Sequence, residues 1–209
     1  MSDSRTRIVE QGYDEIADSF VEWRDRIVGD PRLWWMSQLT SRLEEGARVL
    51  ELGCGAGIPD TRLLAERFRV TGVDISREQV RRARTNVPSA EFIRADFTSL
   101  ELEPASFDAV AAFCSFNNVP RDLLAGVFER IHSWLVPDGL FLTALGTSDT
   151  ESWVGDWLGT TMYFSSFPPD TNRRLLGAAG FELLLDELVI TQEPEPDGEA
   201  TWHWVLARR

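Results

Sequence analysis

One short stretch constrains the fold of this chain more than any other. Residues 49–59 read VLELGCGAGIP: a short apolar run, then glycines at alternate positions, Gly53, Gly55 and Gly57, and then the start of a helical pattern. Glycines allow unusual backbone angles and let a ligand approach the main chain closely. The stretch therefore predicts a buried strand, a tight turn and a helix, with a ligand bound at the turn.

A second strand follows in register with the first. Residues 70–75 read VTGVDI, and Asp74 lies near the end of this run, about twenty residues after the first glycine, where an acid can accept both hydroxyls of a ribose. The alternative is an acid that only caps the next helix, since Ser76 follows it. Together with the glycine turn, the pattern favours an adenosine-containing ligand.

The glycine spacing separates two kinds of adenosine ligand. The dinucleotide fingerprint G-x-G-x-x-G needs its third glycine where this chain has Ile58, and Gly57 comes one residue early. An acid, Glu51, also lies two residues before Gly53. This pattern resembles motif I, E/D-x-G-x-G-x-G, of the class I S-adenosylmethionine-dependent methyltransferases. The cofactor implied is S-adenosyl-L-methionine, which has no pyrophosphate and whose ammonium and sulfonium groups favour a nearby acid.

The resemblance implies a fold and a division of the chain. The fold is α/β, a Rossmann-like seven-stranded mixed sheet with helices on both faces and the last strand antiparallel. The length suits a single domain, residues 1–209. We expect an N-terminal helical lid (1–45), a cofactor-binding core (46–146), an aromatic insertion on the substrate side (147–169), and a C-terminal helix and strands (170–209).

Further motifs extend the expected cofactor site. The motif EFIRADF places Asp96 and Phe97 after a third strand, where the family contacts adenine. The motif FDAVAAFCS is typical of a buried parallel strand, whose tip is expected near the methyl group of the cofactor. GYDEIA resembles the family's lid helix and points to Tyr13. The cofactor contacts that the resemblance implies are Tyr13, Glu51, Gly53, Cys54, Gly55, Gly57, Asp74, Ile75, Asp96, Phe97 and Phe113.

Methyl transfer is an in-line displacement, so positioning and exclusion of water matter most, and a base is needed only for a poorly acidic nucleophile. Neither His132 nor His203 is expected at a strand tip. Many relatives carry histidine where this chain has Asn118, and an amide cannot act as a base. The candidates for a catalytic part are Asn118 and Tyr163, whose hydroxyl could orient a nucleophile.

The segment 147–169 is rich in aromatic residues without a clear period. Such a wall favours an apolar, aromatic or cationic amine acceptor, whereas the alternative is that these rings only pack a small subdomain. The substrate-binding candidates are Asn117, Trp153, Trp157, Tyr163 and Phe164.

Composition limits the partners. The formal charge of -13 and the pI of about 4.6 argue against nucleic acid, and the two cysteines lack the spacing of a metal site. No apolar leader or membrane span is evident, so a cytoplasmic location is expected. The sequence thus predicts a methyltransferase for a small molecule. The alternatives are a non-catalytic protein that binds the cofactor and a nicotinamide-dependent oxidoreductase.

Overall fold

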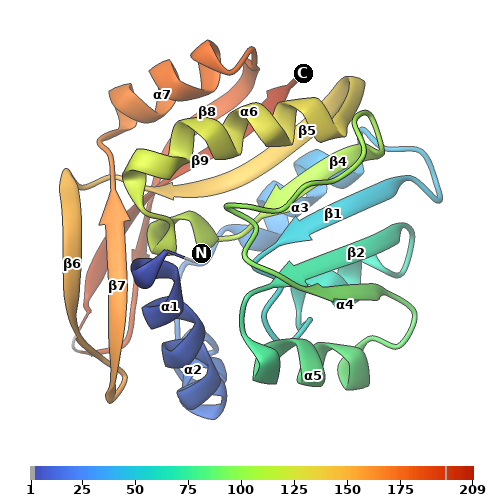
Figure 1. Cartoon of the computed structure of the whole chain (residues 1–209). Coiled ribbons are helices and arrows are strands. Elements are labelled where there is room, and N and C mark those ends of the chain that lie inside the picture. The colour runs from blue at the N-terminus through green and yellow to red at the C-terminus, as the bar shows by residue number, and fades with distance from the viewer. Residues whose placement is uncertain (1–2, 196) are drawn as a thin grey trace.

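The computed structural model describes residues 3–195 and 197–209, so two residues of the expected lid segment and residue 196 lie outside the description. A seven-stranded sheet crosses the molecule (Figure 1). Its strands, in spatial order, are β3 (Glu91–Arg94), β2 (Arg69–Asp74), β1 (Arg48–Leu52), β4 (Phe107–Ala112), β5 (Leu135–Gly146), β9 (Glu199–Arg208) and β8 (Glu182–Gln192).

Strands β1 to β5 run parallel, and β9 is antiparallel to both of its neighbours. This confirms the predicted mixed sheet with its last strand antiparallel. The near-continuous apolar runs of β1 and β4 are buried on both faces, as expected of central parallel strands. Because β2 and β4 lie on opposite sides of β1, the chain reverses direction across the sheet there, and ligands bind at such switch points.

Helices cover both faces of the sheet (Figure 1). On one face lie α3 (Arg32–Thr40), α4 (Asp60–Leu64) and α5 (Arg77–Asn86), and on the other α6 (Leu124–Trp134) and α7 (Pro169–Ala178). Helix α5 begins as the sequence predicts, because the Ser76 side chain accepts a hydrogen bond from the Gln79 backbone N–H.

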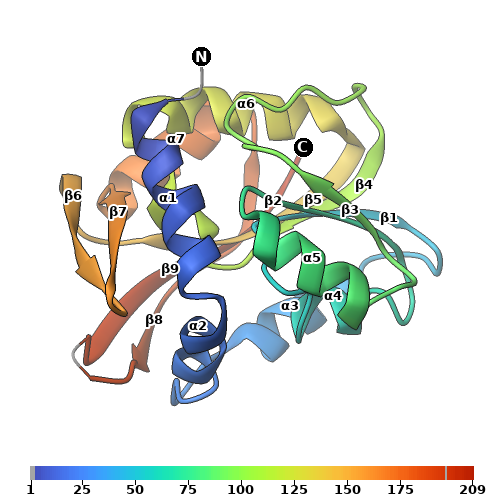
Figure 2. The same ribbon diagram turned by 60° about the horizontal axis from the view of Figure 1, so that its bottom comes forward.

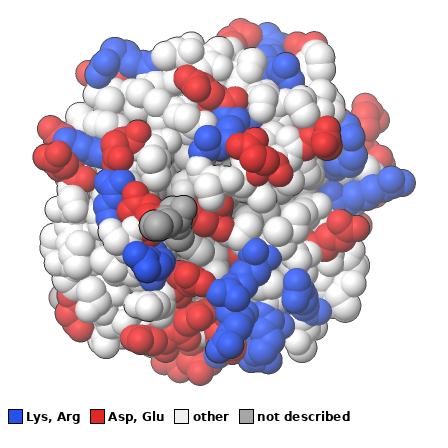
Figure 3. Space-filling view, viewed as in Figure 1, with Lys and Arg blue, Asp and Glu red and all other residues white. Residues whose placement is uncertain are grey.

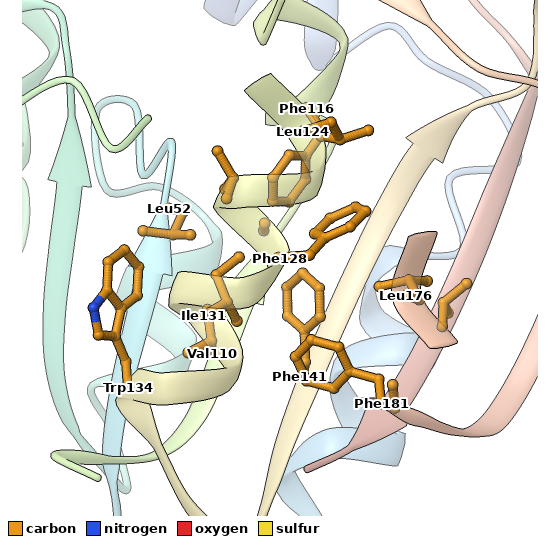
Figure 4. Close-up of a cluster of buried hydrophobic side chains, with 14 of the residues drawn as sticks. Leu52, Val110, Phe116, Leu124, Phe128, Ile131, Trp134, Phe141, Leu176 and Phe181 are labelled. Atoms are coloured by element: carbon orange, nitrogen blue, oxygen red, sulfur yellow. The ribbon is translucent and has the colours of Figure 1, made fainter. Parts of the chain in front are cut away.

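The core beneath α6 fixes the sheet edge that holds the site. Phe128, Ile131 and Trp134 of α6 point at β1, β4 and β5, and contact a cluster that includes Leu52 and Phe141 (Figure 4). All of these side chains are buried. Burial of each large apolar side chain contributes about 1.5–3 kcal/mol, so this cluster holds the ends of β1 and β4 in place.

A smaller layer stands outside the main sheet (Figure 2). It consists of α1 (Ser4–Glu15), α2 (Ala17–Arg24) and a two-stranded sheet of β6 (Thr150–Trp157) and β7 (Thr160–Ser166). Helix α1 packs on β7 through Val9 and Ile16. On its other side, Asp14 accepts hydrogen bonds from the Ser76 hydroxyl and the Glu78 backbone N–H, so α1 joins the hairpin to α5.

Acidic and basic side chains both appear over the face seen in Figure 3, and basic ones gather in one area of its lower part, next to acidic ones. Across residues 3–195 and 197–209, every helix is too short or too polar to cross a bilayer.

Candidate functional site

A cavity of about 420 Å³ lies at the carboxyl edge of the sheet. Its inner wall comes from the segments that follow β1, β2, β3 and β4. Its outer wall comes from α1, α2, the β6–β7 hairpin and the β8–β9 turn. The volume is within the ordinary range for small-molecule sites, about 300–1,000 Å³. The lid segment and the aromatic segment expected from the sequence therefore face the same space as the glycine turn.

The three glycines have different surroundings. Gly55 has φ +53° and lines the cavity. The atom nearest to a methyl group built on Gly55 would be Gln79 Oε1, at 3.9 Å. A methyl group on Gly53 would lie 2.4 Å from Ser115 Cβ, so this glycine lets the tip of β4 come close. Gly57 does not line the cavity, because it packs against α5 at Ala83. Only Gly55 leaves open backbone for a ligand.

Asp74 ends β2 on the cavity wall with 8% of its surface exposed. Its Oδ2 accepts the Gly55 backbone N–H at 2.8 Å, and its Oδ1 accepts that of Ser76 at 2.9 Å. Burial raises the pKa of this carboxyl to about 6, although the two N–H groups act in the opposite direction. Each oxygen keeps a lone pair free, so Asp74 can also accept two ligand hydroxyls.

Gln79 is the clearest sign that the cavity is built for a polar ligand. It is 1% exposed and lines the cavity one helical turn into α5. Neither its amide nitrogen nor its amide oxygen has a hydrogen-bond partner among the described residues. An unpaired buried amide costs about 1–3 kcal/mol, which a ligand with hydroxyl groups beside Asp74 would recover. The residues present therefore fit the sugar and polar edge of the expected cofactor.

The other expected cofactor contacts also line the cavity: Cys54, Ile75, Asp96 and Phe97, and Phe113 at the tip of β4, which is expected near the methyl group. The carboxylate of Asp96 accepts the hydroxyl and backbone N–H of Thr98, at 2.6 and 2.9 Å. Phe97 packs edge-on against Phe116, which belongs to the core beneath α6. The site and the hydrophobic core are thus directly connected.

Glu51 lies away from the cavity, unlike the acid that the sequence led us to expect beside the cofactor. It is 1% exposed, and its Oε2 accepts the Thr61 hydroxyl at 2.6 Å. Burial, followed by the nearby charge of Asp60, raises its pKa to about 8. Arg32, a cation that acts in the opposite direction, is paired with Asp60 at 2.8 Å. Burial therefore disfavours the charged form of Glu51.

Three polar groups join the lid to the tip of β4 and to β7. The hydroxyl of Tyr13, on the cavity wall, donates to Asn118 Oδ1 at 3.1 Å, and Asn118 Nδ2 donates to the Tyr163 carbonyl at 2.9 Å. Burial, and then the charge of Asp74, raise the pKa of Tyr13 above its usual value. Tyr13 is thus a hydrogen-bonding group here rather than a base, and Asn118 holds the lid in place.

The expected substrate residues divide into two groups. Asn117, Trp153, Trp157 and Phe164 line the cavity. Tyr163 does not: it is fully buried beside Val9 and Ile16, and its hydroxyl has no partner among the described residues. Phe164 and Tyr163 are neighbours on β7, so their side chains point to opposite faces of the hairpin. The geometry does not support a catalytic part for the Tyr163 hydroxyl.

Several cavity residues were not predicted from the sequence. Among them are Trp23 of α2, and Glu193, Asp197 and Trp202 of the β8–β9 hairpin, where no motif marks them. Only the folded arrangement brings these distant segments together. The residues that were not predicted also include Arg24, Arg32, Gln79 and Thr98.

His203 is buried away from the cavity, hydrogen-bonded to Asp186 at 2.9 Å, and burial lowers its pKa. His132 lies in α6 against Phe181. Both positions agree with the structural parts expected for them. Among residues 3–195 and 197–209, no group of acids, histidines or cysteines could hold a metal ion.

Residues 49–139, which carry the glycine turn, Asp74 and the β4 tip, match the family of methyltransferase domains. This match supports the resemblance to the class I S-adenosylmethionine-dependent methyltransferases over that region of the chain. The chain is 34% identical over 137 residues to a protein of Geobacillus sp. named a putative methyltransferase, covering 60% of the chain and 55% of that relative. It is 29% identical over 191 residues to a sterol 24-C-methyltransferase of Gibberella zeae, covering 78% and 46%.

The chain also resembles a solved structure over nearly all of its length. That structure is a Burkholderia thailandensis 1,6-didemethyltoxoflavin-N1-methyltransferase with S-adenosylhomocysteine and 1,6-didemethyltoxoflavin bound. The TM-score is 0.70 at 24% identity, covering 98% of this chain and 86% of the other, and the likeness is one of fold. The chain spans about half the length of the curated relatives that it matches first.

Proposed function

We propose that this protein transfers a methyl group from S-adenosylmethionine to a small molecule that enters between α2, the β6–β7 hairpin and the β8–β9 turn. One observation carries the proposal: a single cavity joins Gly55, Asp74 and Gln79 on the cofactor side to Trp153, Trp157 and Phe164 on the other. A methyl donor and a methyl acceptor that are bound in one cavity can approach each other in line, and the rate of methyl transfer depends largely on that approach.

The cofactor's polar groups have partners in this proposal. Asp74 accepts the two ribose hydroxyls, and the amide of Gln79 pairs with polar atoms beside them. Arg24 and Arg32 also line the cavity, and besides their ion pairs with Asp25 and Asp60 they offer N–H donors to the carboxylate of the methionine part. S-adenosylmethionine supplies an activated methyl group on a sulfonium, and the protein holds it against the tip of β4.

The acceptor side acts mainly by positioning. Tyr13 and Asn118 are hydrogen-bonded to each other at the tip of β4, and burial raises the pKa of Tyr13. Among the described cavity residues there is no histidine. The proposed acceptor is therefore one whose attacking atom needs little help in losing its proton. The aromatic wall favours an apolar or aromatic molecule, or an amine.

Calorimetric titration with S-adenosylhomocysteine and with NAD tests the cofactor. We expect binding of the first in the micromolar range and none of the second, and tighter binding of NAD would refute the proposal. Transfer of labelled methyl from S-adenosylmethionine to a panel of small amines, phenols and aromatic heterocycles tests the reaction. Binding of S-adenosylhomocysteine without methyl transfer to any member of the panel would favour a non-catalytic binding protein.

A further inference from the structure

The outer end of the cavity is lined by tryptophans whose indole N–H groups point at two acids. Trp23 of α2 and Trp157 of β6 both donate to Asp197 Oδ2, at 3.0 and 3.3 Å. Their rings meet at an interplanar angle of 75° with centroids 5.2 Å apart. Trp202 of β9 donates to Glu193 Oε1 at 3.1 Å. All five residues line the cavity, and we call this group the indole cage.

Three distant segments form the indole cage. The β8–β9 turn, which carries both acids, lies beside α2 and the lower ends of β6 and β7 in both views (Figures 1 and 2). Phe20 and Tyr13 extend the aromatic surface inward, with ring centroids 6.2 Å and 6.3 Å from those of Trp23 and Trp157 respectively. The cage therefore continues toward Asn118 and the expected methyl group.

The acids of the cage have no cation to balance them. Among the residues that the structure describes, neither Glu193 nor Asp197 takes part in an ion pair. The two arginines of the cavity are engaged elsewhere: Arg24 with Asp25 and the Ile58 carbonyl, and Arg32 with Asp60. Burial, opposed by the Trp202 hydrogen bond, raises the pKa of Glu193, as does the nearby charge of Asp197.

The wall also keeps an unused hydrogen-bond donor. Trp204 is 1% exposed and lines the cavity, and its indole N–H has no partner among the described residues. A buried donor left unpaired points to a ligand with an oxygen or nitrogen atom to accept it. Trp204 therefore leaves one hydrogen-bond donor unused on the wall beside Phe113, while the two acids leave the outer end of the cavity without an ion-pair partner among the described residues.

These features select among classes of ligand. A neutral aromatic molecule would make no use of the two acids, half-buried Glu193 and exposed Asp197, and an anion would be repelled by them. Because the indole N–H groups are already bound to the acids, the rings offer their faces, which attract cations. We propose that the indole cage binds an organic ammonium group of the methyl acceptor. The proposal rests on the proposed function and narrows its acceptor to a cationic molecule.

The ammonium is the group that is held, not the atom that is methylated. A protonated or quaternary nitrogen has no lone pair with which to attack a methyl group. The reacting atom therefore lies elsewhere in the acceptor, on the side of Tyr13 and Asn118. In this arrangement the cage at Asp197 fixes one end of the acceptor and the tip of β4 receives the other.

The test compares two probes of the same shape, choline and its uncharged analogue 3,3-dimethyl-1-butanol. Each is titrated into the full-length protein, with and without S-adenosylhomocysteine, and binding is followed by calorimetry and tryptophan fluorescence. We expect choline to bind at least about tenfold more tightly. Equal affinities, or no choline binding, would overturn the proposal whether or not S-adenosylhomocysteine binds. Failure of S-adenosylhomocysteine to bind would instead count against the proposed function.

Two substitutions assign the preference to the cage. Asp197→Asn with Glu193→Gln keeps an oxygen for each indole N–H and removes both charges, and it should abolish the choline preference. The control is Glu187→Gln, which removes the charge of an exposed acid on β8 and should retain the preference for choline. If the double variant is folded by circular dichroism and keeps the preference, the cage does not hold the cation. The comparison of choline with 3,3-dimethyl-1-butanol on the wild-type protein tests the proposal even if the double variant does not fold.

Discussion

The buried acid Glu51 gives a quantitative test of the structure through the substitution Glu51→Gln. The side chain is 1% exposed, has one hydrogen bond, from Thr61, and has no cation of its own because Arg32 is paired with Asp60. Glutamine has nearly the same shape and can accept the same hydrogen bond. The substitution therefore removes the ionisable group and changes little else.

The direction in which pH changes the stability follows from the pKa of Glu51 in the unfolded chain and in the native state. Burial raises the pKa of Glu51 from 4.5 to about 8, so between these values the native state holds a proton that the unfolded chain has released. The free energy of unfolding therefore falls as the pH rises through this window. The full difference between the two pKa values corresponds to a loss of up to about 5 kcal/mol. Because the charge of Asp60 contributes part of the shift, we expect the free energy of unfolding to fall by on the order of 3 kcal/mol between pH 5 and pH 9.

Urea unfolding followed by tryptophan fluorescence measures this directly. At pH 5 the wild type and Glu51→Gln should agree within about 1 kcal/mol, whereas at pH 9 the variant should be the more stable by about 3 kcal/mol. Titrating groups that do not interact with Glu51 are shared and cancel in the difference, whereas Asp60, which interacts with it, cancels only in part. Glu187→Gln, on the surface, should follow the wild type at every pH. Parallel pH profiles for the wild type and Glu51→Gln would show that Glu51 is already ionised in the native state.

Four further predictions concern the site and the hairpin beside it. Asp74→Ala should weaken S-adenosylhomocysteine binding by about 1.5–3 kcal/mol in calorimetry, and unchanged affinity in a folded variant would remove Asp74 from the site. Because ligand hydroxyls favour the charged form of Asp74, wild-type affinity should also fall as the pH is lowered below about 6. Gly55→Val should abolish cofactor binding, since it fills the open backbone at φ +53°, and retained binding would contradict this. Tyr163→Phe should raise the free energy of unfolding by about 1 kcal/mol by removing an unpaired buried hydroxyl, and a loss of stability would reveal a hidden partner.

The cofactor half of the molecule could be predicted because its signals are local. Asp74 lies at the end of its strand and beside the glycine turn, and the family motifs carry the same spacing. The fold follows from the same segments, since the buried runs of β1 and β4 require a parallel sheet covered on both faces. The place of Glu51 was harder to foresee, because a motif fixes its position in the chain but not the burial that raises its pKa.

The acceptor half could be predicted only in outline. A shift in register between Thr150 and Trp153 interrupts the alternation of the β6–β7 hairpin, so residues 147–169 show no clear period. Had a strand been recognised there, alternation would have placed Tyr163 and Phe164 on opposite faces. The acids Glu193 and Asp197 carry no sequence signal, because Trp202 lies across their own hairpin and the partners Trp157 and Trp23 come from two other segments.

The distribution of the site along the chain has an evolutionary consequence. Gly55, Asp74 and Gln79 all lie within the region 49–139 that matches other methyltransferase domains, whereas Trp23, Trp157 and Asp197 all lie outside it. Substitutions in the outer segments can alter the acceptor while the cofactor edge stays intact. Selection can therefore act on the two halves separately, and a lineage can acquire a new acceptor through changes in α2, one hairpin and one turn.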